Sequence, residues 1–187
     1  MRIGIFGGTF DPPHLGHWLA AVDAAEALAL DQVVWVPAAQ QPLKTAAASA
    51  SSTHRLAMTA LSVQGEPHFS VDPVELERGG PSFMVDTLQT YRARHPGAAL
   101  FLLLGMDAAA LLPKWREPAV ILELAEVVAL TRSGEAGELP IGVRALPTRR
   151  VDISATEIRA RVAAGHSIRG FVHDAVAGYI SAHGLYR

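Results

Sequence analysis

The sequence predicts an α/β fold in which a doubly wound, Rossmann-like parallel sheet carries helices on both faces. Short apolar runs alternate with amphipathic stretches along most of the chain. A complete strand–helix–strand unit fits within residues 2–36. The most hydrophobic run, 99–104, lies mid-chain, as expected for a central strand covered on both sides. Alternation of this kind is typical of doubly wound sheets.

The first unit is the clearest. Residues 2–6 form a short apolar run that stops at two glycines, which predicts a buried strand. Residues 15–28 carry apolar side chains at helical spacing from Leu15 to Val22, which predicts an amphipathic helix. Residues 32–36 are rich in β-branched side chains and end at a proline. These elements indicate parallel strands joined by a right-handed crossover.

The other elements follow in the same manner. We expect helix 54–64, strand 68–71, helix 82–94, strand 99–104, helix 117–125, strand 126–131, strand 150–153, helix 154–164 and helix 172–183. Two stretches, 37–53 and 133–142, have the composition of loops, and neither is long enough to separate two domains. We therefore expect one domain over 1–187, with a short helical part from about 154 to 187.

Bulk composition excludes several classes of protein. Half the residues are hydrophobic, 18% are charged and the net charge is −2, so no basic excess points to a nucleic-acid partner. There are no cysteines, which excludes disulfides and thiolate zinc sites. No stretch has the composition of a membrane span or a signal peptide. We expect a cytoplasmic protein, with homo-oligomerisation left open.

The loop after the first strand predicts a phosphate site. Its glycines let the backbone turn sharply, and the helix from about Leu15 offers free N–H groups to an anion. His14 and His17 lie on the first turn of that helix, and Gly16 leaves space between them. A structural role for a histidine at a helix start is also common, and a zinc pair would lack a third ligand. Asp11, beside two prolines, is expected to shape the loop.

A second candidate lies at 153–159. Ser154 and Glu157 have the spacing of a capping box, which any helix can use. The same helix start also carries Thr156 and Arg159 on one face, and a guanidinium can bind phosphate oxygens in a forked manner. Both interpretations remain open from the residues alone.

Taken together, the two segments resemble the nucleotidyltransferase superfamily that includes class I aminoacyl-tRNA synthetases. The string from Gly7 to His17 is similar to its glycine loop and His-x-Gly-His box, and 153–159 is similar to the Ile-Ser-x-Thr-x-x-Arg segment of adenylyltransferases, with Ala155 at the second serine. The resemblance implies that ATP binds at Gly7, Gly8, Thr9, Phe10, His17, Gly105, Asp107, Ile153, Ser154, Thr156 and Arg159. Asp107 would accept from ribose hydroxyls, unless it only caps a helix.

The rest of the chain resembles the bacterial nicotinate-nucleotide adenylyltransferase family, through Pro42-Leu43-Lys44, Gly105-Met106-Asp107 and Lys114-Trp115-Arg116. That resemblance implies adenylyl transfer from ATP to nicotinate mononucleotide. The implied nicotinate-nucleotide site comprises Gly8, Thr9, Lys44, Ser82, Phe83, Met84 and Trp115. The implied catalytic residues are His14, His17, Lys44 and Arg159. Mg²⁺ is expected to be held by ATP phosphates and water, with no protein metal site.

Several alternatives stay open. Phe83 and Met84 replace a tyrosine and a threonine of the family, so nicotinamide mononucleotide is a rival acceptor. Phosphopantetheine is a second rival acceptor, and a nucleotide-binding regulator without activity is a rival of another class. Trp115 has a flat indole face for stacking on a pyridine ring, but a place in the core would equally suit it.

Overall fold

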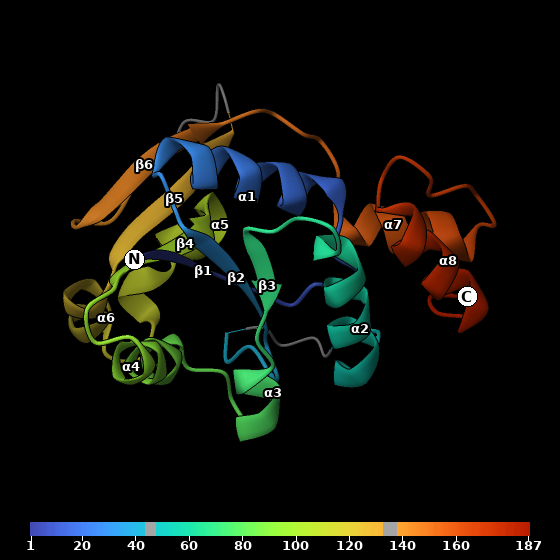
Figure 1. The fold of residues 1–187 in the computed structure, drawn as a ribbon. Coiled ribbons are helices and arrows are strands. Elements are labelled where there is room, and N and C mark those ends of the chain that lie inside the picture. The colour runs from blue at the N-terminus through green and yellow to red at the C-terminus, as the bar shows by residue number, and fades with distance from the viewer. Residues whose placement is uncertain (44–47, 133–137) are drawn as a thin grey trace.

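The computed structural model describes residues 1–43, 48–132 and 138–187, and its centre is a six-stranded sheet (Figure 1). The strands are β1 (Arg2–Gly8), β2 (Gln32–Pro37), β3 (Phe69–Val71), β4 (Ala99–Gly105), β5 (Glu126–Arg132) and β6 (Val143–Thr148). Every neighbouring pair is parallel, in the order β3-β2-β1-β4-β5-β6. The expected doubly wound sheet is confirmed, and its strand order reverses between β1 and β4.

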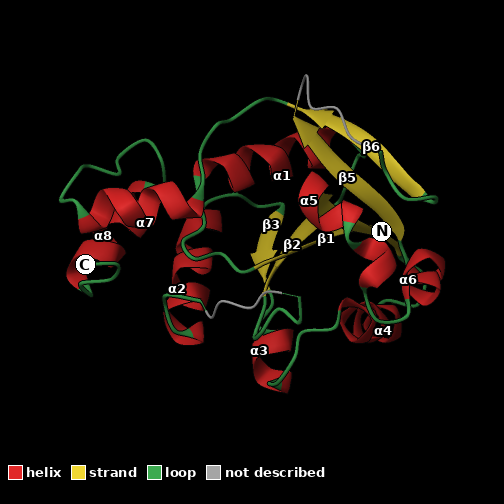
Figure 2. Cartoon of the chain, turned by 180° about the vertical axis from the view of Figure 1, so that it is seen from behind, coloured by secondary structure: helices red, strands yellow, loops and turns green. Residues whose placement is uncertain are grey.

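Helices cover both faces of this sheet (Figures 1 and 2). They are α1 (Leu15–Ala27), α2 (Ser52–Val63), α3 (Val74–Arg78), α4 (Met84–Arg94), α5 (Met106–Ala110), the 3₁₀ turn η1 (Leu112–Lys114), α6 (Pro118–Leu124), α7 (Ala155–Ala163) and α8 (Asp174–Ala182). None of the helices in the described parts of the chain is long and apolar enough to cross a bilayer.

Two apolar clusters fill the space between the sheet and its helices. Ile3 and Ile5 of β1 point into a cluster with α4 and α6, whereas Phe6 points into a cluster with α1. Neighbouring strands alternate in the same way, because successive side chains of a strand face opposite sides. Strands buried on both sides read as continuous apolar runs, and this is why residues 2–6 and 99–104 are easily predicted.

The C-terminal helices α7 and α8 lie away from the sheet, beside α2 (Figures 1 and 2). A third cluster joins them: Met58 of α2 is fully buried against Ile158, Val176 and Ile180. Through this cluster, α2 connects the C-terminal helices to the rest of the fold.

The strand expected at 150–153 is wrong, because the last strand is β6 at Val143–Thr148. This strand forms the edge of the sheet and is partly exposed, so it lacks the continuous apolar run of the central strands. Residues 150–153 instead form the connection to α7, where the exposed Arg150 pairs with Asp152. The short helix α3 is not among the expected elements, because five residues carry too little helical periodicity, and α5 is considered only as a helix that Asp107 could cap.

A candidate nucleotide site at the β1–β4 edge

The predicted phosphate loop and Gly105 lie at neighbouring strand ends. Gly7 and Gly8 end β1, Gly105 ends β4, and these strands pair directly where the strand order reverses. Open α/β sheets bind ligands at such a crevice. Gly105 is the N-cap of α5, and Asp107 lies exposed in the first turn of that helix. Asp107 is therefore not the helix cap.

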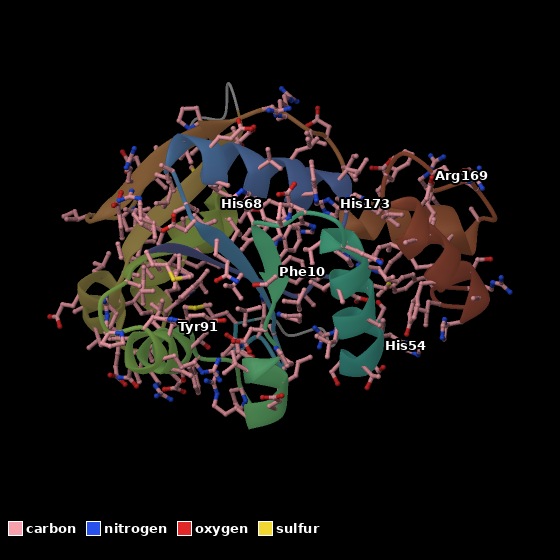
Figure 3. The ribbon with its side chains drawn as sticks, viewed as in Figure 1. Phe10, His54, His68, Tyr91, Arg169 and His173 are labelled. Atoms are coloured by element: carbon pink, nitrogen blue, oxygen red, sulfur yellow. The ribbon has the colours of Figure 1, made fainter. Side chains whose placement is uncertain are left out.

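The two loop glycines lie close to neighbouring side chains. A β-carbon on Gly7 would lie 2.9 Å from Cε of Met84, and one on Gly8 would lie 2.7 Å from Cζ of Phe10. Phe10 has a left-handed backbone with φ of 49° and is 2% exposed. Its ring packs against Phe6 and Trp35 in the interior of the molecule (Figure 3). Phe10 can therefore meet a nucleotide only through its backbone.

His14 and His17 form a stacked pair at the start of α1. Their ring centroids are 3.7 Å apart with an interplanar angle of 29°. The backbone N–H of His14 donates to Nδ1 of His17 at 3.3 Å, so in the neutral ring of His17 the proton resides on Nε2. A β-carbon on Gly16 would lie 3.0 Å from Nδ1 of His14. The space at Gly16 is thus occupied by the ring of His14.

The carboxylate of Asp11 ties this loop to two distant segments. It is 5% exposed and accepts from the backbone N–H groups of Ser49 at 2.6 Å and Ala50 at 3.1 Å. It also accepts from the hydroxyl of Tyr186 at 2.7 Å. Asp11 therefore shapes the loop, and its carboxylate is engaged with protein donors.

Arg55 supports the same loop from α2. It is 2% exposed, and its Nη1 and Nη2 donate to the carbonyl oxygens of Thr9 at 2.8 Å and Ala39 at 3.4 Å. Burial lowers the pKa of Arg55, and the nearby Asp11 and Tyr186 act in the opposite direction. Arg55 is not among the residues predicted for the site. The available signal was a charged residue in the stripe that faces the interior of α2: Arg55, Met58, Thr59 and Ser62.

The second predicted motif reaches the first. Arg159 of α7 donates from Nη1 to the carbonyl oxygen of Asp11 at 2.8 Å and from Nη2 to Oγ1 of Thr156 at 3.2 Å. Ser154 caps α7 by accepting from the backbone N–H of Glu157 at 3.1 Å, which confirms its capping role. Ile153 is half-buried against the C-terminal cluster.

The segment expected to hold the nicotinate nucleotide lies at the start of α4. The oxygen of Ser82 accepts from the N–H of Ala39 at 2.8 Å, and its hydroxyl also hydrogen-bonds the buried Glu75. The side chain of Ser82 is thus occupied within the protein. Phe83 is the N-cap of α4, and Met84 is the first residue of that helix. The backbone amides of this helix start are the groups best placed to meet an anion.

Trp115 follows η1 and is half-buried against the cluster of α4 and α6. The next residue, Arg116, pairs with Asp86 and lies 4.5 Å from the ring of Phe83. These contacts place the Trp115 segment at the first turn of α4. Lys44, the remaining predicted site residue, lies outside the described residues.

The donor set around the loop consists of histidine rings, guanidinium groups and backbone amides. In the described ranges, no three histidine, aspartate or glutamate side chains gather into a group that could hold a metal ion. Such a set suits Mg²⁺ only when the ion arrives on nucleotide phosphates and keeps water ligands.

Comparison with known proteins gives a consistent result. The model of the cytidylyltransferase-like family matches residues 5–161. A probable nicotinate-nucleotide adenylyltransferase of Gemmatimonas aurantiaca is 52% identical and is aligned over 100% of this chain and 93% of its own. A probable nicotinate-nucleotide adenylyltransferase of Thermus thermophilus is 47% identical over the full length of both chains. The fold is shared with the nicotinic acid mononucleotide adenylyltransferase of Plasmodium falciparum complexed with NaAD, with a TM-score of 0.78, 18% identity, and coverage of 99% of this chain and 97% of the other.

Proposed function

Since this chain belongs to the nicotinate-nucleotide adenylyltransferase family of cytidylyltransferase-like proteins, we propose that it transfers the adenylyl group of ATP to nicotinate mononucleotide. The products are deamido-NAD and pyrophosphate, and the reaction is a step of NAD biosynthesis. The observation that carries this proposal is the meeting of Arg159 with the His14–His17 loop at the carboxyl ends of β1 and β4. The proposed ATP site therefore has two parts: the histidine loop near the N-terminus, and the Arg159 segment near the C-terminus.

The chemistry requires no nucleophile from the protein. A phosphate oxygen of nicotinate mononucleotide attacks the α-phosphorus of ATP, a new P–O bond forms, and the bond to the bridging oxygen breaks as pyrophosphate leaves. Such transfers depend on positioning and on stabilising negative charge. Mg²⁺ would arrive with ATP, held by its phosphates and by water, and would supply neutralisation of their charge.

His17 is the donor to the α-phosphate in this proposal. Its Nδ1 accepts from the backbone N–H of His14, so in the neutral ring Nε2–H is the group that would donate to the phosphate. His14, stacked on that ring, holds its orientation and supports the bridging oxygens. Arg159 and Lys44 neutralise phosphate charge. ATP lies between Gly7 to Phe10, Gly105 and Asp107 on one side and Ile153, Ser154 and Thr156 on the other.

The acceptor nucleotide occupies the start of α4 in this proposal. The backbone amides of Phe83 and Met84 bind the nicotinate carboxylate, because the hydroxyl of Ser82 already serves Ala39 and Glu75. Trp115 stacks on the pyridine ring from the neighbouring segment. Backbone recognition explains how a phenylalanine can stand at position 83.

The test is pyrophosphate release from Mg²⁺-ATP with nicotinate mononucleotide, nicotinamide mononucleotide and phosphopantetheine, each supplied in turn. We expect the highest kcat/KM with nicotinate mononucleotide. Preference for the nicotinamide form would overturn the proposed acceptor, and no release with any acceptor would overturn the activity. His17→Ala assayed in parallel identifies release that comes from a contaminating enzyme.

We further propose that 1–187 acts as one domain in the cytoplasm. Two groups of the C-terminal part, the guanidinium of Arg159 and the hydroxyl of Tyr186, bond directly to Asp11 in the first loop. The C-terminal helices are therefore part of the site.

A further inference from the structure

Tyr186, which follows α8, reaches the middle of the nucleotide loop. Its hydroxyl donates to Oδ1 of Asp11 at 2.7 Å, and its ring packs in the C-terminal cluster with Met58. Its backbone is left-handed, with φ of 65°. Burial, with the hydrogen bond and charge of Asp11, raises the pKa of Tyr186, so the hydroxyl keeps its proton and remains a donor.

Asp11 accepts two hydrogen bonds from the C-terminal part of the chain. Its side chain accepts from Tyr186, and its backbone carbonyl accepts from Arg159. Three residues further on, His14 caps α1 and stacks on His17. Asp11 thus connects the C-terminal helices to the loop that carries the histidine pair.

We propose that Tyr186 is a positioning residue for adenylyl transfer, which acts through Asp11 to hold the histidine loop and Arg159 in register around the ATP phosphates. The proposal rests on the proposed use of ATP. Without the hydroxyl of Tyr186, the carboxylate of Asp11 still accepts hydrogen bonds from the N–H groups of Ser49 and Ala50, which continue to hold the loop. The side-chain tie to the C-terminal helices is lost, and errors of about 1 Å in such constellations can reduce rates up to about 10²-fold.

Tyr179 provides a matched control. It lies on α8 and packs in the same cluster, and its hydroxyl is 3.0 Å from Nδ1 of His54 on α2. His54 lies on the side of α2 that faces the C-terminal helices (Figure 3). Tyr179→Phe therefore removes one hydroxyl from a half-buried tyrosine of the same cluster without touching the nucleotide loop.

The experiment compares Tyr186→Phe and Tyr179→Phe in the full chain. For Tyr186→Phe we expect kcat/KM for ATP to fall by roughly 10-fold, the scale of one well-placed hydrogen bond, with KM for nicotinate mononucleotide within about twofold of the wild type. For Tyr179→Phe we expect all kinetic constants to stay within about twofold, while both variants lose similar thermal stability. In an Asp11→Ala background, Tyr186→Phe should add little further loss.

Three outcomes would overturn the proposal: unchanged kinetics in Tyr186→Phe, equal losses in the two tyrosine variants, or a loss confined to the KM of the acceptor. Calorimetric binding of a non-hydrolysable ATP analogue without acceptor separates this inference from the proposed function. If the wild-type chain turned over none of the acceptors, the proposed activity would fail, and Tyr186 would still be judged by analogue affinity. Equal affinity of Tyr186→Phe and the wild type in that case would also overturn the proposal.

Discussion

Nη1 of Arg159 donates to the carbonyl oxygen of Asp11 at 2.8 Å, across 148 residues of sequence. The bond joins the middle of α7 to the loop after β1, and the bond from Nη2 to Thr156 fixes the plane of the guanidinium. An arginine held on two sides in this way presents a fixed fork, and its remaining donors can meet phosphate oxygens.

Arg159→Lys should reduce kcat/KM for ATP by roughly 10-fold, because an ammonium keeps the charge but cannot hold Asp11 and Thr156 at the same time. The matched control is Arg161→Lys on the same helix. Arg161 donates to the carbonyl oxygen of Ser167 and lies over the ring of Phe171, whereas Arg159 bonds to Asp11 of the loop. Steady-state kinetics with ATP as the varied substrate test this prediction, and equal effects in both variants would contradict it.

His17→Ala should lower kcat by about 10²–10³-fold, the range for loss of one donor to a charge that develops in the transition state. The fold should largely survive, because the hydrogen bond that His17 accepts comes from an N–H at a helix start, where water can replace it. Rapid-quench turnover and a thermal melt are the two measurements. Near-normal turnover would remove His17 from its proposed role.

Gly16→Ala should separate stability from activity. Alanine favours a helix over glycine by about 1 kcal/mol, so the melting temperature should hold or rise. The new methyl group would meet the ring of His14 at 3.0–3.1 Å and push it from its stack on His17, so kcat should fall by roughly 5- to 10-fold. Gly178→Ala on α8, where a β-carbon meets nothing, should gain stability and keep full activity. Unchanged turnover in Gly16→Ala would show that the stack is not needed.

Trp115→Ala should act on the acceptor alone. Loss of stacking costs about 1–3 kcal/mol for a base on an aromatic ring, so KM for nicotinate mononucleotide should rise by roughly 10-fold or more, with KM for ATP almost unchanged. Trp115→Phe retains a flat aromatic face, so its KM for nicotinate mononucleotide should lie between those of the wild type and Trp115→Ala. A larger change in KM for ATP than for the acceptor would assign Trp115 to the other half of the site.

Sequence reasoning succeeded where the physical cause is local. β1 and β4 are buried on both faces and therefore appear as unbroken apolar runs. The histidine pair and its glycine spacing lie within one helical turn, so their proximity follows from chain geometry. The edge strand β6 was not predicted, because half of its residues face solvent and its sequence pattern does not differ from that of a loop.

The parts that sequence could not predict depend on contacts between distant segments. The bond between Tyr186 and Asp11 spans 175 residues, and a lone tyrosine after a helix carries no signal of its partner. Ser82 is predicted to meet the ligand, but its sequence context does not reveal that its hydroxyl also bonds to Ala39 and Glu75, which come from other elements. Tertiary packing determines these hydrogen-bond partners, and neither the spacing nor the type of the residues reveals them.

The buried Glu75 should make stability depend on pH in a defined direction. It is 2% exposed and accepts from Oγ1 of Thr87 at 2.7 Å. Burial raises its pKa above the ordinary value of 4.5, although hydrogen bonds from Thr87 and Ser82 and the charge of Arg78 oppose the rise. In the window between the two pKa values the folded state binds more protons than the unfolded state, so the free energy of unfolding falls as pH rises.

Glu75→Gln removes this titration and keeps an oxygen that can accept from Thr87. Relative to this variant, the wild type should therefore lose stability as pH rises from about 4 through the raised pKa of Glu75, and the difference should level off above it. Urea unfolding from about pH 4 to about pH 8 measures the difference. Glu77→Gln, at an exposed position of the same helix, should give a curve that follows the wild type at every pH. If the curves for Glu75→Gln and the wild type ran parallel, Glu75 would titrate alike in the folded and unfolded chains, and burial would not control its charge.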